Sequence, residues 1–113
     1  MNYNAVIENL ISSLKPSDPL RIILFGSCAE GKQNENSDID LMVILDNDHV
    51  SETYEERLNK KISVRNLVLD INRKMPLDIL VYSKKELKLI KEHGNYFIDE
   101  IERTGTIIYE KAG

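Results

Sequence analysis

Two aspartates and a glycine–serine pair are the residues of this chain whose types and spacing are best suited to chemistry. Asp38 and Asp40 stand at positions i and i+2 where an apolar run begins, so on a strand their carboxylates would project to one face. Gly26 has no Cβ and lets the backbone approach a phosphate closely, and Ser27 adds a hydroxyl where a helix is expected to begin. Because carboxylates are hard ligands for Mg²⁺, the pattern predicts a site for a divalent cation that carries a nucleoside triphosphate.

A third carboxylate is expected on a neighbouring strand, and Asp78 in the apolar segment 76–81 is the best candidate. An unpaired charge within an apolar strand is costly, which indicates a functional role for this residue. In a two-metal site such a group helps to activate the incoming hydroxyl, as a metal ligand, a general base or both. Asp70 is the rival, but we expect it to lie on a helix and to face solvent. Strand burial is the property that separates the two candidates.

The elements that must position these residues alternate between helix and strand. Short apolar runs predict strands at residues 20–25, 39–45, 77–82 and 106–109. Helical spacing and capping signals predict helices at residues 4–14, 51–73, 84–90 and 95–103. The alternation indicates an α/β layer rather than a helical bundle.

The segment 51–73 is expected to form the longest helix. Ser51, followed by Glu52 and Glu55, resembles a helix start, because acidic groups favour the positive end of the helix dipole. The apolar side chains of this helix form a stripe that we expect in the core rather than in a groove for a partner: Leu58, Ile62, Val68, Leu69 and Ile71.

The segment between the first two strands is expected to hold the phosphates. Ser27 is predicted to cap a short helical turn that runs through Glu30 and ends at Gly31. Residues 32–37 are polar and are predicted to form a loop.

Length and composition favour one compact domain, residues 1–113, in a reducing compartment. The net charge of −4, from 15 basic and 19 acidic residues, does not favour a general nucleic-acid binder. Cys28 is the only cysteine, so no disulfide can form within the chain. The first residues lack the pattern of a signal peptide, and the apolar runs are too short to span a bilayer. We therefore expect a cytoplasmic protein with no membrane contact and no direct nucleic-acid partner.

The pattern Gly-Ser-x-Ala-x-Gly at residues 26–31, followed by Ser-Asp-x-Asp at residues 37–40, resembles the signature of the DNA polymerase β-like nucleotidyltransferase superfamily. The short chain is most similar to its minimal nucleotidyltransferase (MNT) branch, the antitoxins of HEPN/MNT toxin–antitoxin pairs. The resemblance covers essentially the whole chain. It implies an α+β fold with a small mixed β-sheet flanked by helices, the polymerase β-like nucleotidyltransferase fold.

The resemblance also assigns roles to individual residues. Gly26 and Ser27 match the phosphate-binding pair of the family. Asp38 and Asp40 match the metal-binding pair, and both belong to the catalytic set. Asp78 matches the third catalytic carboxylate, which is also a metal ligand. Two Mg²⁺ ions are expected, with ATP as the co-substrate.

Two positions depart from the family pattern. Many members carry a basic residue where this chain has Glu30, and the position of Cys28 is often large or basic in relatives. Lys32 is then the candidate for the cation beside the phosphates. The departures bear on the affinity for the triphosphate more than on metal binding.

The activity that the resemblance implies is transfer of AMP from Mg²⁺-ATP to a tyrosine hydroxyl of a cognate HEPN ribonuclease toxin. The modification would silence the toxin within a hetero-oligomer. Two alternatives stay open: a non-catalytic antitoxin that masks its toxin by binding, and a transferase that modifies a small molecule such as an aminoglycoside. A DNA polymerase is disfavoured, because no template-binding region is evident and the chain is acidic.

Other features have simpler interpretations. Alternating oxygen-bearing residues at 34–40 would suit a calcium loop, but Ile39 stands where an EF-hand needs glycine. Cys28 is interpreted as a small packing residue, since no histidine lies nearby in the sequence. Four lysines after the third predicted strand are interpreted first as a solvated helix face, and second as a docking patch: Lys84, Lys85, Lys88 and Lys91.

Overall fold

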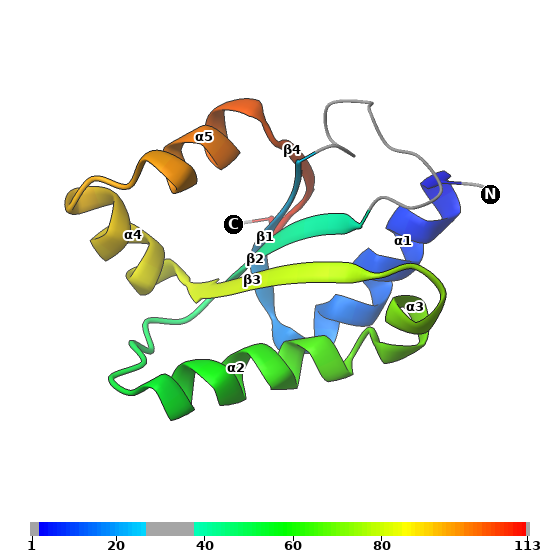
Figure 1. The fold of residues 1–113 in the computed structure, drawn as a ribbon, viewed down its shortest axis with the longest axis horizontal. Helices are drawn as coiled ribbons and strands as arrows, with labels where there is room; N and C mark the ends of the chain where they lie inside the picture. The colour runs from blue at the N-terminus through cyan, green and yellow to red at the C-terminus, as the bar shows by residue number, and fades with distance from the viewer. Residues whose placement is uncertain (1–2, 27–37, 113) are drawn as a thin grey trace.

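The computed structural model describes residues 3–26 and 38–112, and its strands form one mixed sheet in the order β3-β2-β1-β4 (Figure 1). The strands are β1 (Pro19–Phe25), β2 (Ile39–Leu45), β3 (Leu77–Ser83) and β4 (Thr106–Glu110). β1 pairs antiparallel with both β2 and β4, whereas β2 and β3 run parallel. The small mixed sheet confirms the expected fold class, and all four predicted strands are present within a residue or so of their expected ends.

Helices cover both faces of this sheet (Figure 1). They are α1 (Tyr3–Leu14), α2 (Tyr54–Asn66), α3 (Leu69–Lys74), α4 (Lys84–Glu92) and α5 (Tyr96–Thr104), with a 3₁₀ turn at Lys15–Ser17. One core cluster joins α1, α2 and α3 to one face, and a second joins α4 and α5 to the other. The two central strands, β1 and β2, are therefore buried on both sides and read as near-continuous apolar runs in the sequence. Among the described residues, no helix combines the length and the apolar character that a membrane crossing requires.

The single long helix expected at 51–73 is wrong, because the structure divides this segment into α2 and α3. The break falls at Leu67 and Val68, whose backbone N–H groups donate to carbonyls only three residues back. Val68 is 1% exposed, so the turn places this side chain in the core beneath the two helices.

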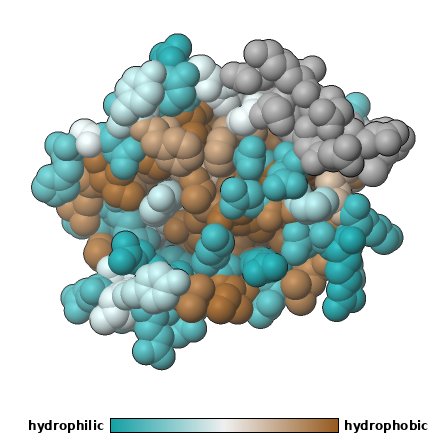
Figure 2. Space-filling model, viewed as in Figure 1, coloured by the Kyte–Doolittle hydropathy of each residue, from teal (hydrophilic) through white to brown (hydrophobic). Residues whose placement is uncertain are grey.

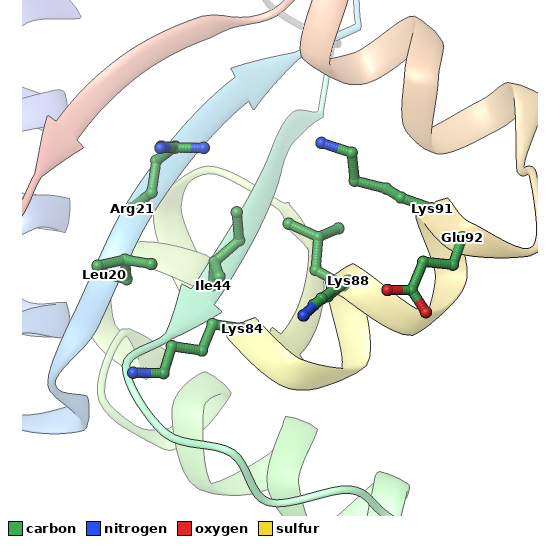
Figure 3. A pocket seen from close by; sticks show the side chains of 8 residues that line it. Leu20, Arg21, Ile44, Lys84, Lys88, Lys91 and Glu92 are labelled. Carbon is green, nitrogen blue, oxygen red and sulfur yellow. The ribbon is translucent and has the colours of Figure 1, made fainter.

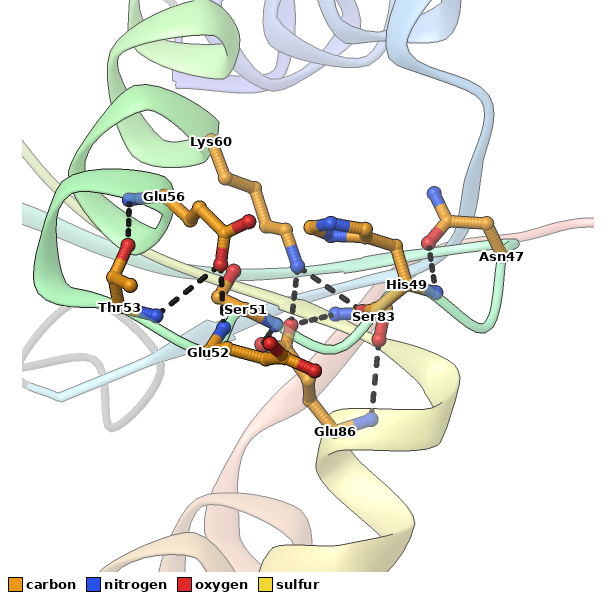
Figure 4. Close-up of polar contacts among 9 residues, drawn as sticks. All are labelled: Asn47, His49, Ser51, Glu52, Thr53, Glu56, Lys60, Ser83 and Glu86. Atoms are coloured by element: carbon orange, nitrogen blue, oxygen red, sulfur yellow. Dashed lines mark hydrogen bonds and ion pairs between the residues drawn. The ribbon is translucent and has the colours of Figure 1, made fainter.

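The start of α2 also differs from the expectation. Its N-cap is Thr53, not Ser51. The Thr53 Oγ1 accepts a hydrogen bond from the backbone N–H of Glu56 at 3.1 Å, and the Glu56 carboxylate accepts one from the backbone N–H of Thr53 at 3.2 Å (Figure 4). This reciprocal capping box satisfies two backbone donors that Ser51 could not reach.

The core stripe predicted for this segment is correct only in part. Val68 is buried and Ile71 packs against the core, but Leu58, Ile62 and Leu69 are 40%, 41% and 37% exposed. The helix turns Val64 inward instead, at 2% exposure. α2 carries apolar residues on more than one side, and its contact with the sheet determines which side is buried.

Glu86 links α2 to α4 through a nearly buried ion pair (Figure 4). Its carboxylate accepts a hydrogen bond from Lys60 Nζ at 2.6 Å and others from the backbone N–H groups of Ser83 and Ser51. Burial raises the pKa of the Glu86 carboxyl, but the bonds from Lys60 and from the two backbone donors outweigh burial and lower it overall. The Glu86 carboxylate therefore stays ionised in the folded protein as long as Lys60 and the two backbone donors remain in place.

We expect Lys60→Met to lower the free energy of unfolding by about 2–4 kcal/mol, because it leaves the Glu86 carboxylate buried without its charge partner. Lys61→Met removes an exposed lysine from the same helix and is the matched control. A carboxyl whose folded pKa is depressed stabilises the protein above its ordinary value of 4.5, and this contribution disappears as the pH falls through the folded pKa. Urea unfolding at pH 7 and below pH 4 should therefore show the difference between the two variants shrink in acid. Equal stabilities at pH 7 would contradict this role for Lys60.

Candidate active site

The strand register brings two of the three predicted carboxylates side by side. Asp40 on β2 is paired in register with Asp78 on β3, and side chains at paired positions of parallel strands point to the same face. Asp40 alternates with Ile39 and Leu41, which pack against α1, α2 and α3, so Asp40 projects to the face that carries α4 and α5. Asp38 lies two positions before Asp40, just ahead of β2. The three carboxylates thus come from adjacent points at one end of the sheet.

Electrostatics supports the same grouping. Asp40 is half-buried, and Asp38 and Asp78 are exposed. Burial raises the pKa of the Asp40 carboxyl, and the negative charges of Asp78 and then Asp38 raise it further. The three groups therefore repel one another across this end of the sheet, which is the condition that a bound cation relieves.

Gly26 is held against this cluster by its position after β1. It has φ +73°, a left-handed conformation that favours glycine, and a Cβ built on it would lie 2.2 Å from Asp40 Oδ2. β1 ends at Phe25, which is the register partner of Asp40 across the antiparallel pair. The missing side chain at Gly26 is what leaves room for the Asp40 carboxylate, a reason for this glycine beyond the approach of a phosphate.

The donor chemistry fits a magnesium ion. Mg²⁺ binds oxygen ligands and usually takes one or two carboxylates, completing its shell with water and phosphate oxygens. Within residues 3–26 and 38–112, no group of three His, Cys, Asp or Glu side chains is arranged so that it could hold a metal ion. A cation bound by Asp38 and Asp40, with Asp78 beside them, would therefore need phosphate oxygens and water to complete its shell.

Other predicted site residues fall outside the described part of the chain. Ser27 and Lys32 belong to residues 27–37, as do Cys28 and Glu30, so the predicted cap and the phosphate-binding cation stay predictions.

The choice of Asp78 over Asp70 rested on strand burial, and that criterion is wrong. Asp78 does lie on a strand, but that strand, β3, is at the edge of the sheet, and the Asp78 side chain is exposed. Asp70 is on α3, almost fully exposed, with its carboxylate 3.5 Å from Arg73 Nη1. What separates the two residues is the register of Asp78 with Asp40 and the charge interaction between them.

An aromatic pair borders the carboxylates and was missed in the sequence. The rings of Phe25 and Phe97 meet edge to face with centroids 6.1 Å apart, and Phe97 on α5 is 54% exposed. Because Phe25 is paired with Asp40, the two rings form an apolar wall beside the site. The available signal was the position of Phe25 directly before Gly26; nothing in the sequence links it to Phe97.

A cavity of about 390 Å³ lies on the same face but at the far end of the strands, between β1 and α4 (Figure 3). It contains none of the three carboxylates. Arg21 pairs with Glu110 at 3.1 Å, and two of the lysines pair with Asp46 and Glu102. Because most of the basic side chains that line the cavity already pair with a carboxylate, the structure favours the interpretation of the α4 lysines as a solvated helix face.

Residues 8–112 match the family described as polymerase beta, nucleotidyltransferase. No curated protein matched the chain by sequence.

Two solved structures share the fold. One is described as a toxin–antitoxin with AMP-PNP; it is 18% identical, with a TM-score of 0.61, and the match covers 93% of this chain and 73% of that one. The other is a putative nucleotidyltransferase from Sulfolobus solfataricus, 17% identical with a TM-score of 0.54, and the match covers 95% of this chain and 76% of that one. At these identities the likeness concerns the fold.

Proposed function

The chain belongs to the polymerase β-like nucleotidyltransferase family, and from this premise we propose that it is an antitoxin that transfers AMP from Mg²⁺-ATP to a tyrosine of a HEPN-type toxin. The family match supports nucleotide transfer. The structural neighbour described as a toxin–antitoxin with AMP-PNP supports a toxin as the partner and a nucleotide as the donor.

The observation that carries the proposal is the convergence at Asp40. Its register partner is Asp78, its pKa is raised by burial and by the other two carboxylates, and Gly26 makes room for it. A sheet that only needed to pack would gain nothing from three acids at one end of two adjacent strands.

In the proposed reaction, the tyrosine oxygen forms a bond to the α-phosphorus of ATP, and the bond from that phosphorus to the β-phosphate bridging oxygen breaks. Pyrophosphate leaves, and the phenol proton passes to Asp78 or to water. When bound, Mg²⁺ neutralises the phosphate oxygens and polarises the α-phosphate. Asp38 and Asp40 would hold the cation, and the absence of a side chain at Gly26 leaves room for the Asp40 carboxylate.

The direct experiment is co-incubation of the protein with the product of the adjacent open reading frame, ATP and Mg²⁺, followed by intact-mass analysis. The proposal predicts a mass increase of the partner by one or more AMP units, and its loss when Asp38 is replaced by alanine. The absence of any such adduct, or an equal yield from the variant, would defeat the enzymatic proposal.

A second candidate keeps the complex and drops the chemistry. Glu30 stands where many family members carry a basic residue, which favours weaker binding of the triphosphate. If the protein only masks its toxin, the double variant Asp38→Asn/Asp40→Asn should still rescue growth of cells that express the toxin. Failure of that variant to rescue, with wild-type protein levels, rules masking out.

A further inference from the structure

One helix exposes an apolar row where the sequence predicted core packing. Tyr54, Leu58 and Ile62 stand four residues apart on α2, so they form one row along its surface. Their exposed fractions are 73%, 40% and 41%. Apolar atoms are visible at the surface over α2 in the lower part of Figure 2. A row of this kind on an otherwise polar helix indicates a contact that the isolated chain does not make.

A row of basic side chains runs directly beside the apolar row. Arg57, Lys61 and Arg65 are each three residues after a member of it and are all exposed. Within the described part of the chain, none of the three makes an ion pair. The chain as a whole carries a net charge of −4, so this is a local positive strip on an acidic protein. Uncommitted like charges in one line favour a partner with acidic groups in a matching line.

The location of α2 connects this surface to the carboxylates. α2 packs against β3, the edge strand on which Asp78 lies. Figure 1 shows α2 running alongside β3 in the opposite direction, with its C-terminal end near α3, where β3 begins. Asp78 is the second residue of β3, so the C-terminal end of the α2 surface, at Ile62 and Arg65, lies toward the end of the sheet that carries the site. α2 covers the face opposite to Asp40, so a partner seated on it would have to reach the carboxylates around the edge strand β3.

We propose that the α2 surface, defined by Tyr54, Leu58 and Ile62 with Arg57, Lys61 and Arg65, docks a helix of the acceptor protein that carries Asp or Glu beside an apolar stripe. The identity of this partner as the acceptor rests on the proposed function. A ridge of side chains spaced four residues apart packs best into the grooves of another helix. A second copy of the chain fits less well, because a two-fold contact between identical surfaces would bring two basic rows together.

The test measures binding to the product of the adjacent open reading frame by calorimetry, without ATP. Lys61→Glu/Arg65→Glu reverses two charges of the basic row. Lys85→Glu/Lys88→Glu reverses two exposed α4 lysines that likewise make no ion pair in the described residues, and it is the matched control. We expect the α2 variant to weaken binding by about 10²-fold and the α4 variant by less than about threefold. Equal binding by the two variants, or no binding by the wild type, would overturn the docking proposal.

A second variant guards against misfolding. Leu58→Ser/Ile62→Ser keeps every charge and replaces two half-exposed side chains, so the fold should survive while partner binding weakens. Sedimentation of the chain alone should be the same for wild type and variants; a change there would assign the surface to a second copy and overturn the proposal.

The readouts separate this inference from the proposed function. Binding that depends on α2 without any AMP adduct supports the docking surface and removes the enzymatic proposal. AMP transfer that is undiminished in the α2 variants removes the docking surface and leaves the enzymatic proposal in place.

Discussion

Replacing Asp40 with asparagine is expected to lower the rate of AMP transfer by about 10³-fold or more and to raise the melting temperature of the metal-free protein. The loss of rate follows because the amide no longer supplies the negative charge that holds the cation against the triphosphate. Several kcal/mol of transition-state stabilisation depend on that charge, and each 1.36 kcal/mol corresponds to about tenfold in rate.

The gain in stability has a separate cause. Burial and the charges of Asp78 and Asp38 raise the pKa of Asp40, so its ionised form is less stable in the folded protein than in the unfolded chain. The folded state therefore loses stability as the pH rises above the ordinary value of 3.8, and asparagine removes this penalty. The increase in melting temperature should be present at pH 7 and vanish in acid.

Single-turnover transfer assays and thermal unfolding in the presence of EDTA measure the two effects. Asp70→Asn is the control, because Asp70 is an exposed aspartate whose carboxylate contacts only Arg73 among the ion pairs of the described residues. Saturating Mg²⁺ should stabilise the wild type and the control but not the Asp40 variant. An Asp40 variant that is less stable than the wild type at pH 7, or equally active, contradicts the role assigned to this carboxylate.

Replacing Gly26 with alanine is expected to lower the transfer rate by about 10²-fold, without removing any catalytic group. The new Cβ would lie 2.2 Å from Asp40 Oδ2, so the carboxylate must move away from its position beside Asp78. A displacement of about 1 Å in a catalytic constellation costs rate on this scale. Alanine at φ +73° also adds backbone strain of about 1–2 kcal/mol.

Gly94→Ala provides a matched control for the strain. Gly94 has φ +78°, nearly the same conformation, and nothing lies within 4 Å of a Cβ built there. The two alanine variants should therefore lose similar stability from strain, while only the Gly26 variant loses activity and metal affinity. Comparable transfer rates for the two would show that the Asp40 carboxylate does not depend on the space at Gly26.

The strands and the first carboxylate pair could be predicted because their signals are local. The run from Leu41 to Leu45 is apolar on both faces, as the core clusters on either side of β2 require. The sequence also places Asp38 and Asp40 where β2 begins, although β2 starts at Ile39 and only Asp40 lies on the strand, so a shared face for the two carboxylates stays a prediction. These features depend on residues that are close in the sequence, so a single sequence is enough to predict them.

The predictions that were wrong concern features that depend on contacts between residues far apart in the sequence. No local signal in the sequence predicts that α2 buries Val64 and leaves Leu58 and Ile62 at the surface. Which row of a helix faces inward depends on its contact with the sheet. The break between α2 and α3 at Val68 likewise contains no glycine or proline that would predict it. Asp78 was selected on burial that it does not have, and its actual link to Asp40 is a register between strands separated by two helices.

The most direct test of the account is a crystal structure of the protein grown with Mn²⁺ and a non-hydrolysable ATP analogue, with the metal located by its anomalous scattering. Convergence of the three carboxylates predicts a peak at the start of β2, about 2.1 Å from oxygens of Asp38 and Asp40 and beside Asp78, with phosphate oxygens completing the shell. A metal–nucleotide complex bound elsewhere on the chain, or Asp78 turned away from an occupied site, would contradict it.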